Sequence, residues 1–159
     1  MLQQIEIHQK PELKLACLAI RASLNDDIEQ GLVKTLRETF ASRRNEISAA
    51  IGESIYLVQA YDDCQWTPDT PFLHLVGIEV SDFTGLPEGM TAHCIPAGSF
   101  IEFRHQGPEE DIDATYDAIN EWLETNGYDE PRAFDYEEWD PSLMNNSSPP
   151  IIPIYIPVK

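Results

Sequence analysis

Acidic and aromatic side chains alternate in residues 134–139, whose sequence is FDYEEW. In a strand, successive side chains point to opposite faces, so Asp135, Glu137 and Trp139 share one face and the remaining residues share the other. A carboxylate among aromatic rings suits an organic cation, because ring faces attract positive charge and a desolvated carboxylate supplies a charge partner. The segment therefore contains the residue types of a cation-binding site.

Aromatic residues elsewhere in the chain extend this chemistry. The rings available for such a site are Trp66, Phe72, Trp122, Tyr136, Trp139 and Tyr155. Trp122 falls on the apolar stripe of a predicted helix, where packing in the core is the simpler interpretation. We assign Trp66, Tyr136 and Trp139 first to a binding site and keep Trp122 as a further candidate.

A strand, a turn and a helix are predicted between Ala97 and Gly127. Residues 99–104 alternate, with Ile101 and Phe103 on one face, which is typical of a half-buried strand. Gly107 and Pro108 end the strand, and the three acidic residues that follow favour the positive end of a helix. Apolar residues spaced by three and four predict that this helix covers residues 111–126.

The first half of the chain repeats this order of elements. An apolar stripe formed by Ile28, Leu32, Leu36 and Phe40 predicts one long helix, with Arg37 on or near its outer side. The predicted strands cover residues 13–22, 54–60, 72–80, 91–104, 133–139 and 151–158, with a kink at residues 96–98.

This order predicts a duplicated α+β architecture. Two βαββ modules, about residues 1–85 and about residues 90–159, would be related by a pseudo-twofold axis and form a single domain over residues 1–159. Two long helices among about six strands favour a mostly antiparallel sheet, because a doubly wound parallel sheet needs a helix between nearly every pair of strands.

The charge balance excludes several classes of partner. Ten basic and 28 acidic residues give a formal net charge of -18, which repels phosphate backbones and anionic lipid surfaces. We therefore expect no nucleic-acid partner. Because no segment has the apolar length needed to span a bilayer, we expect no membrane partner and a cytoplasmic protein.

Cysteine and histidine spacing gives no sign of a metal or a cofactor. Cys17, Cys64 and Cys94 are odd in number and widely separated, so neither a disulfide framework nor a zinc motif is indicated. The four histidines show no metal-ligand spacing, and none adjoins a serine or cysteine suited to nucleophilic catalysis. We expect no metal, no cofactor and no catalytic triad.

A combination of motifs resembles a known bacterial family. The strings AGSFIEFRHQGPEEDIDATYDAINEWLETNGY, AFDYEEWDP and IPIYIPVK are together similar to the GyrI-like small-molecule-binding domain, which is also the effector-binding domain of AraC-type and MerR-type multidrug-sensing regulators. The second half of the chain carries the resemblance in its residues, and the first half carries it in the order of its elements.

The resemblance implies a groove on the sheet between the helices that takes lipophilic, often cationic, molecules. An acidic residue in the strand after the second helix meets the positive charge, and aromatic side chains sandwich the ligand. Asp135 is the position we match to that acid, although the family more often has glutamate followed by tyrosine, and Glu137 or Glu138 are the alternatives. Because the family's groove lies on the open sheet face, Glu79 and Glu102 are secondary candidates.

These features predict a multidrug-type binding protein that senses or sequesters a compound. Since no part of the chain resembles the family's helix-turn-helix, we expect a stand-alone member. One alternative is hydrolysis of strained lipophilic compounds by a pocket carboxylate with Tyr116 or Tyr136. The other is modulation of a basic protein partner through the acidic surface, as gyrase-modulating members of the family do.

Overall fold

A computed structural model describes residues 2–61, 67–128, 132–145 and 150–158. The strands are β1 (Leu2–Lys10), β2 (Leu13–Ala22), β3 (Ala50–Ala60), β4 (Phe72–Val80), β5 (Thr91–Ile95), β6 (Gly98–Gln106), β7 (Phe134–Trp139) and β8 (Ile151–Val158). The α-helices are α1 (Leu24–Gln30), α2 (Leu32–Arg43), α3 (Ile112–Thr125) and α4 (Pro141–Asn145), with 3₁₀ turns η1 (Arg44–Glu46) and η2 (Glu109–Asp111).

One antiparallel sheet contains all eight strands, in the order β1-β6-β8-β7-β3-β4-β2-β5. Exchanging β1 with β5, β2 with β6, β3 with β7 and β4 with β8 gives the same order read from the other end. The pseudo-twofold relation therefore falls between β7 and β3, which lie side by side in the middle of the sheet. The predicted α+β class, with a mostly antiparallel sheet and two long helices, is confirmed.

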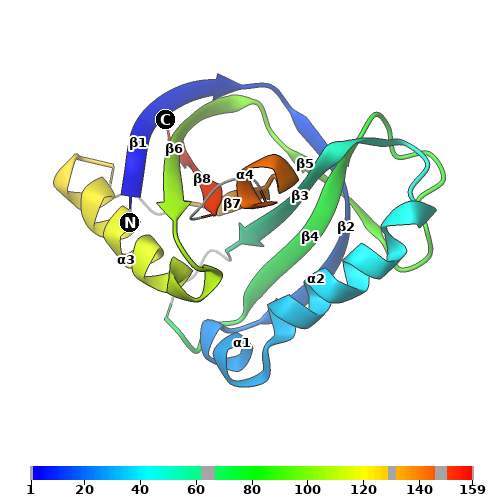
Figure 1. The fold of residues 1–159 in the computed structure, drawn as a ribbon, viewed down its shortest axis with the longest axis horizontal. Coiled ribbons are helices and arrows are strands. Elements are labelled where there is room, and N and C mark those ends of the chain that lie inside the picture. Colours follow the sequence, from blue (N-terminus) through cyan, green and yellow to red (C-terminus); the bar gives the residue numbers. More distant parts are fainter. Residues whose placement is uncertain (1, 62–66, 129–131, 146–149, 159) are drawn as a thin grey trace.

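Two long arms curl the sheet (Figure 1). β1 leads into β2 across Pro11, and β5 leads into β6 across the kink predicted at residues 96–98. Lys10 pairs with Gly98 and Leu13 pairs with Ile95, so the two arms run past each other in opposite directions. The sequence patterns did not predict β1, because this edge strand is mostly polar and depends on its pairing with β6.

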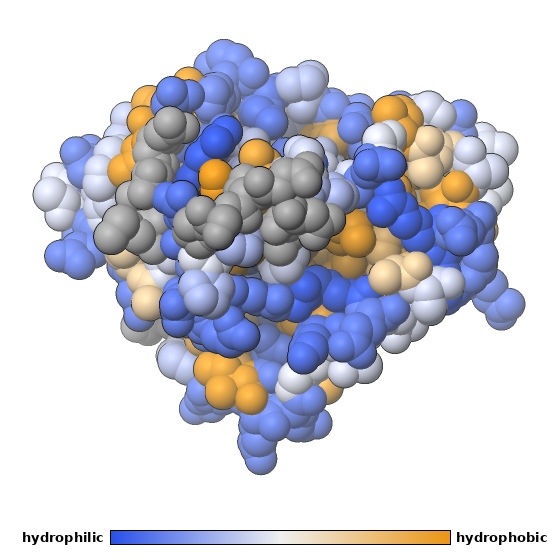
Figure 2. Space-filling view, in the orientation of Figure 1, coloured by the Kyte–Doolittle hydropathy of each residue, from blue (hydrophilic) through white to orange (hydrophobic). Residues whose placement is uncertain are grey.

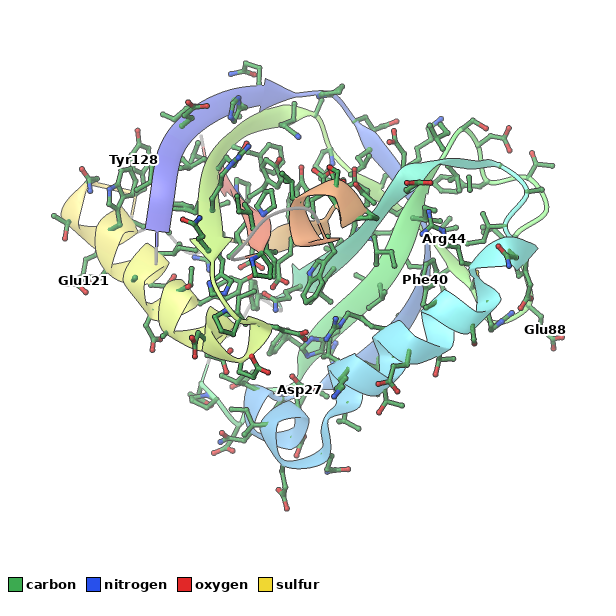
Figure 3. All side chains as sticks on the ribbon, in the orientation of Figure 1. Asp27, Phe40, Arg44, Glu88, Glu121 and Tyr128 are labelled. Carbon is green, nitrogen blue, oxygen red and sulfur yellow. The ribbon has the colours of Figure 1, made fainter. Side chains whose placement is uncertain are left out.

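The single long helix predicted in the first half is wrong, because the structure has two helices there. Gly31 adopts φ 63°, and its N–H donates to the carbonyl of Asp27, which ends α1. The carboxylate of Asp27 then accepts the N–H of Val33 in the first turn of α2 at 2.8 Å. The break turns α1 away from the axis of α2, and Asp27 lies at the corner between them (Figure 3).

The long helices cover the same face of the sheet at separate places. Phe40 of α2 is buried against β2, β3 and β4, and Ile119 of α3 is buried against β6 and β8. Figure 1 shows α2 and α3 on opposite flanks of the curled sheet. The opposite sheet face has its own core, around Tyr136, Tyr155 and Phe100. The middle strands β3 and β7 are thus left open between the two helices.

One face of the molecule can be seen in space-filling form in Figure 2. Hydrophilic residues dominate the face shown in Figure 2, as the net charge of -18 leads one to expect. Within the described ranges, no helix is long and apolar enough to cross a membrane.

Candidate functional site: a buried carboxylate between the two long helices

A cavity of about 600 Å³ lies between α1, α2 and α3, with β3, β4 and β7 forming its floor. Its volume is in the range of sites that bury drug-sized molecules. Aromatic and imidazole rings from β4, α3, β7 and the residue after β3 face it, namely Tyr61, Phe72, His74, Tyr116 and Trp139. The cavity therefore combines apolar ring surface with a polar floor.

Glu137 of β7 lies in the floor of this cavity and is only 2% exposed. The hydroxyl of Tyr116 donates to Oε2 at 2.6 Å, and the indole Nε1 of Trp139 donates to Oε1 at 2.8 Å. Both donors are neutral. Among the described residues, no cationic nitrogen pairs with this carboxylate.

Burial raises the pKa of Glu137 to about 7, because desolvation penalises the ionised form. The hydrogen bonds from Tyr116 and Trp139 oppose this shift, as does the charge of Arg37, while the charge of Asp135 adds to it. Near neutral pH the group is thus poised between its two protonation states. A cation entering the cavity would favour the ionised state.

Asp135, two residues earlier on the same face, already has a cationic partner. The residue is fully buried, and its Oδ2 accepts the hydroxyl of Tyr61 at 2.7 Å and Nε of Arg132 at 2.9 Å. Arg132 also donates to the amide oxygen of Asn120 on α3 at 3.1 Å. Burial raises the pKa of Asp135, and these partners oppose the rise. Asp135 therefore connects β7 to the residue that follows β3 and, through Arg132, to α3.

The rim of the cavity is charged. Asp27, Asp113 and Asp117 line it from α1 and α3. Burial, together with the charges of Asp27 and Asp117, raises the pKa of Asp113. Across the rim, Arg37 of α2 pairs with Glu109 of η2, and its guanidinium carbon lies 4.2 Å from the centre of the Trp139 ring.

Only some of the residues that the sequence predicted for the site line the cavity. Glu137 and Trp139 line it, as their shared strand face requires, and Asp135 lies directly behind. Tyr136 points to the opposite sheet face, where its ring stacks on Tyr155 at 4.9 Å. Trp66 lies outside the described residues.

Three further candidates also lie away from the cavity. Glu102 shares the face of Tyr136 and accepts from Nε of Arg104 at 2.6 Å. Glu79 points to that same face, because it alternates with Ile78, which packs beneath α2. Trp122 packs edge-on against Phe103 with ring centres 5.4 Å apart, within the core under α3. Glu102 and Trp122 thus have structural contacts of their own.

Sequence reasoning missed the two arginines and Tyr61. Arg37 was placed on or near the outer side of its helix, yet its side chain is only 19% exposed and lies across the rim. Arg132 lies three residues before Asp135. Because the chain has only ten basic residues, an arginine so close to a predicted site acid was a signal for an ion pair. No local pattern brings Tyr61, 74 residues away, to Asp135.

The fold and the cavity define the class of this chain, a small-molecule-binding domain in which two helices flank a groove on an antiparallel sheet. A family model described as the GyrI-like small molecule binding domain matches residues 3–159. The chain belongs to that family, which confirms the resemblance of its motifs.

Individual relatives agree with this membership. The transcriptional regulator BrlR of Pseudomonas aeruginosa is 29% identical over 125 residues, which cover 77% of this chain and 45% of BrlR. This chain thus matches less than half the length of that relative.

Solved structures share the fold at low sequence identity. SAV2435 bound to tetraphenylphosphonium has a TM-score of 0.74 and 11% identity, covering 99% of this chain and 94% of that chain. The C-terminal domain of EcmrR has a TM-score of 0.73 and 16% identity, covering 100% of this chain and 99% of that chain.

Proposed function

We propose that this domain binds a lipophilic organic cation in the cavity between α2 and α3, and that it senses or sequesters that compound. The observation that carries the proposal is the state of Glu137, a buried carboxylate that faces a ring-lined cavity and whose hydrogen-bond donors, within the described residues, are both neutral. Burying an unpaired charge is costly, and a ligand cation would offset that cost.

The two acids on this face of β7 differ in their partners. Asp135 has Arg132 as its counter-ion, so a ligand would gain little from its charge. Glu137 lacks a counter-ion among the described residues. We therefore propose that Glu137, and not Asp135, is the acid that meets the positive charge of the ligand. Tyr116 and Trp139 hold its two oxygens in place.

One structure with the same fold holds a ligand of this class. SAV2435 was solved with tetraphenylphosphonium, a bulky aromatic cation. The low identity to SAV2435 carries the fold alone, so the ligand class of this chain rests on its own cavity. The acidic rim formed by Asp27, Asp113 and Asp117 attracts cations from solution.

The test compares two ions of the same shape and opposite charge, tetraphenylphosphonium and tetraphenylborate. We expect the cation to raise the melting temperature and the anion to leave it unchanged. At a hundredfold excess over the dissociation constant, ligand binding adds about 2.7 kcal/mol to the free energy of unfolding.

Variants then locate the site. Glu137→Gln keeps the shape of the side chain and should abolish most of the stabilisation by the cation, while Glu138→Gln, on the opposite sheet face, should leave it intact. Equal stabilisation by the cation and the anion, or an unchanged response in Glu137→Gln, would count against the proposal.

A second candidate function rests on the pair formed by Glu137 and Tyr116. A carboxyl group whose pKa is about 7 is suited to act as a general acid or base near neutral pH, and the Tyr116 hydroxyl lies 2.6 Å from it. Hydrolysis of a strained lipophilic compound, such as an activated cyclopropane, would use these two groups. Product formation that is lost in both Glu137→Gln and Tyr116→Phe would support this function.

A further inference from the structure

A second, smaller cavity adjoins the first. Its volume is about 270 Å³, and Ala41 and Ile55 supply its apolar lining. Both cavities are lined by the same four residues, namely Lys34, Arg37, Glu109 and Trp139. The boundary between the two cavities is therefore made of a few side chains at the rim.

The pair formed by Arg37 and Glu109 spans this boundary. Arg37 projects from α2, and Glu109 lies in the turn that leads into α3, so the ion pair joins the two sides of the groove. Glu109 is 46% exposed, and the pair is therefore well hydrated on one side. Contacts of this kind are weak and break readily.

Arg37 also covers the aromatic ring nearest the buried carboxylate. Its guanidinium carbon lies 4.2 Å from the centre of the Trp139 ring, and the indole N–H of Trp139 donates to Glu137. A cation over an aromatic face, close to a carboxylate, is the arrangement a cationic ligand would adopt. In the structure, a side chain of the protein occupies that position.

Not all hydrogen-bond donors of Arg37 are satisfied within the described residues. Its Nε atom is buried and has no hydrogen-bond partner among the described residues. A buried unsatisfied donor destabilises the conformation that buries it, so moving Arg37 outward costs less than breaking a fully satisfied contact. Lys34, one turn earlier on α2, is exposed at the same rim and has no cation–π contact with any ring in the described part of the chain.

We propose that Arg37 is a specificity-determining residue, a tethered cation that occupies the Trp139 ring face and divides one long groove into two cavities. The inference rests on the proposed function of the Glu137 site. Compact cations fit the larger cavity with Arg37 in place. Elongated aromatic cations reach into both cavities only when they displace Arg37 from Trp139 and Glu109.

The test uses two fluorescence or calorimetric titrations, with tetraphenylphosphonium as the compact cation and thioflavin T as the elongated, flat one. We expect Arg37→Met to raise the affinity for thioflavin T by about tenfold, because displacing a stacked guanidinium is no longer required. Its affinity for tetraphenylphosphonium should change by less than about threefold. Lys34→Met removes the same charge from the same rim and should leave the preference between the two cations unchanged.

A second variant separates this inference from simple charge attraction. Glu109→Gln removes an acidic group from the rim, so charge attraction alone predicts weaker binding of both cations. Release of Arg37 predicts the opposite, a higher affinity for thioflavin T. Weaker binding of thioflavin T to Glu109→Gln would overturn the inference, as would equal effects of Arg37→Met and Lys34→Met.

The two proposals fail in different ways. If tetraphenylphosphonium does not bind the parent protein, or binds Glu137→Gln equally well, the proposed function fails. If that cation binds through Glu137 but Arg37→Met leaves the affinity for thioflavin T unchanged, only the role of Arg37 fails. Circular dichroism of each variant checks that it is folded.

Discussion

The hydroxyl of Tyr116 lies 2.6 Å from the carboxylate of Glu137 and joins the second turn of α3 to the floor strand β7. Tyr116 thereby stabilises the ionised form of a group whose burial favours the neutral form. Burial also raises the pKa of Tyr116 itself, with the charge of Glu137 adding to the shift, so the phenol remains the donor. The balance between burial and these hydrogen bonds determines the pKa of Glu137.

Binding of a permanent cation should depend on pH. Below the Glu137 pKa of about 7 the carboxyl is increasingly neutral and loses its attraction for the ligand. We expect the affinity for tetraphenylphosphonium to rise with pH and to level off above about pH 8, with a slope approaching tenfold per pH unit well below the pKa. Calorimetry at several pH values measures this profile. A flat profile between pH 5 and pH 8 would exclude Glu137 as the charge partner.

The free energy of unfolding of the ligand-free protein should also depend on the ionisation of Glu137. In contrast to cation affinity, this stability should fall as pH rises. The folded-state pKa of Glu137 is raised from 4.5 to about 7, so its contribution to stability is fully present below pH 4.5 and is lost as pH rises through 7. Glu137→Gln should therefore gain stability relative to the parent as pH rises, by about 3 kcal/mol at pH 8 compared with pH 4.5.

Urea denaturation at both pH values gives this difference between the two proteins. Glu138→Gln serves as the control, because that side chain lies on the other face of the sheet. A difference that stays constant with pH would mean that Glu137 has an ordinary pKa.

Tyr116→Phe should shift the titration of Glu137 upward. Loss of the hydroxyl removes a hydrogen bond that favours the carboxylate, so the pKa rises further and cation binding at pH 7 weakens. We expect a stability loss of about 1 kcal/mol. The midpoint of the pH profile for tetraphenylphosphonium binding, compared between parent and variant, measures the shift. A downward shift would contradict the assigned donor.

Arg132→Met should destabilise the fold through Asp135. The variant leaves a fully buried carboxylate without its cation, which costs about 3 to 5 kcal/mol. The double variant Arg132→Met with Asp135→Asn should recover much of this loss, because the neutral amide needs no counter-ion. Denaturant unfolding of the single and double variants gives the coupling. No recovery in the double variant would mean that Arg132 acts independently of Asp135.

Two tryptophans should respond differently to truncation. Trp139→Ala removes a ring that lines the cavity and holds Glu137, so the affinity for tetraphenylphosphonium should fall by about tenfold or more. Trp122→Ala should cost about 2 kcal/mol of stability, because its ring packs against Phe103 and Tyr128. The affinity of Trp122→Ala should stay within about twofold of the parent, as measured by calorimetry at a temperature where both variants are folded.

Periodicity in the sequence predicted the elements that carry the site. The apolar spacing of residues 111–126 predicted α3, and the alternation in β7 placed Glu137 and Trp139 on one face. The repeated order of strand, helix, strand and strand predicted the duplicated α+β class that the sheet order confirms. These features follow from local backbone geometry, which repeats every 3.6 residues in a helix and every two in a strand.

Contacts between distant segments decided the chemistry. Asp135 and Glu137 are equivalent in the alternation of β7, but Tyr61 and Arg132 pair with Asp135 and leave Glu137 with neutral donors. Hydrogen-bond partners and desolvation depend on what packs around a side chain, and strand alternation contains no information about that. The same reason explains why β1 and the position of Arg37 over Trp139 were not foreseen.

The amino-acid sequence by itself thus determined the family, the class of fold and the strand that carries the acidic and aromatic residues. Only the tertiary structure decided which carboxylate faces the cavity without a counter-ion in the described part of the chain, and which of the chain's few cations covers the ring beside it. Secondary-structure periods are encoded locally, whereas charge pairing and burial arise when β7, α2 and α3 come together.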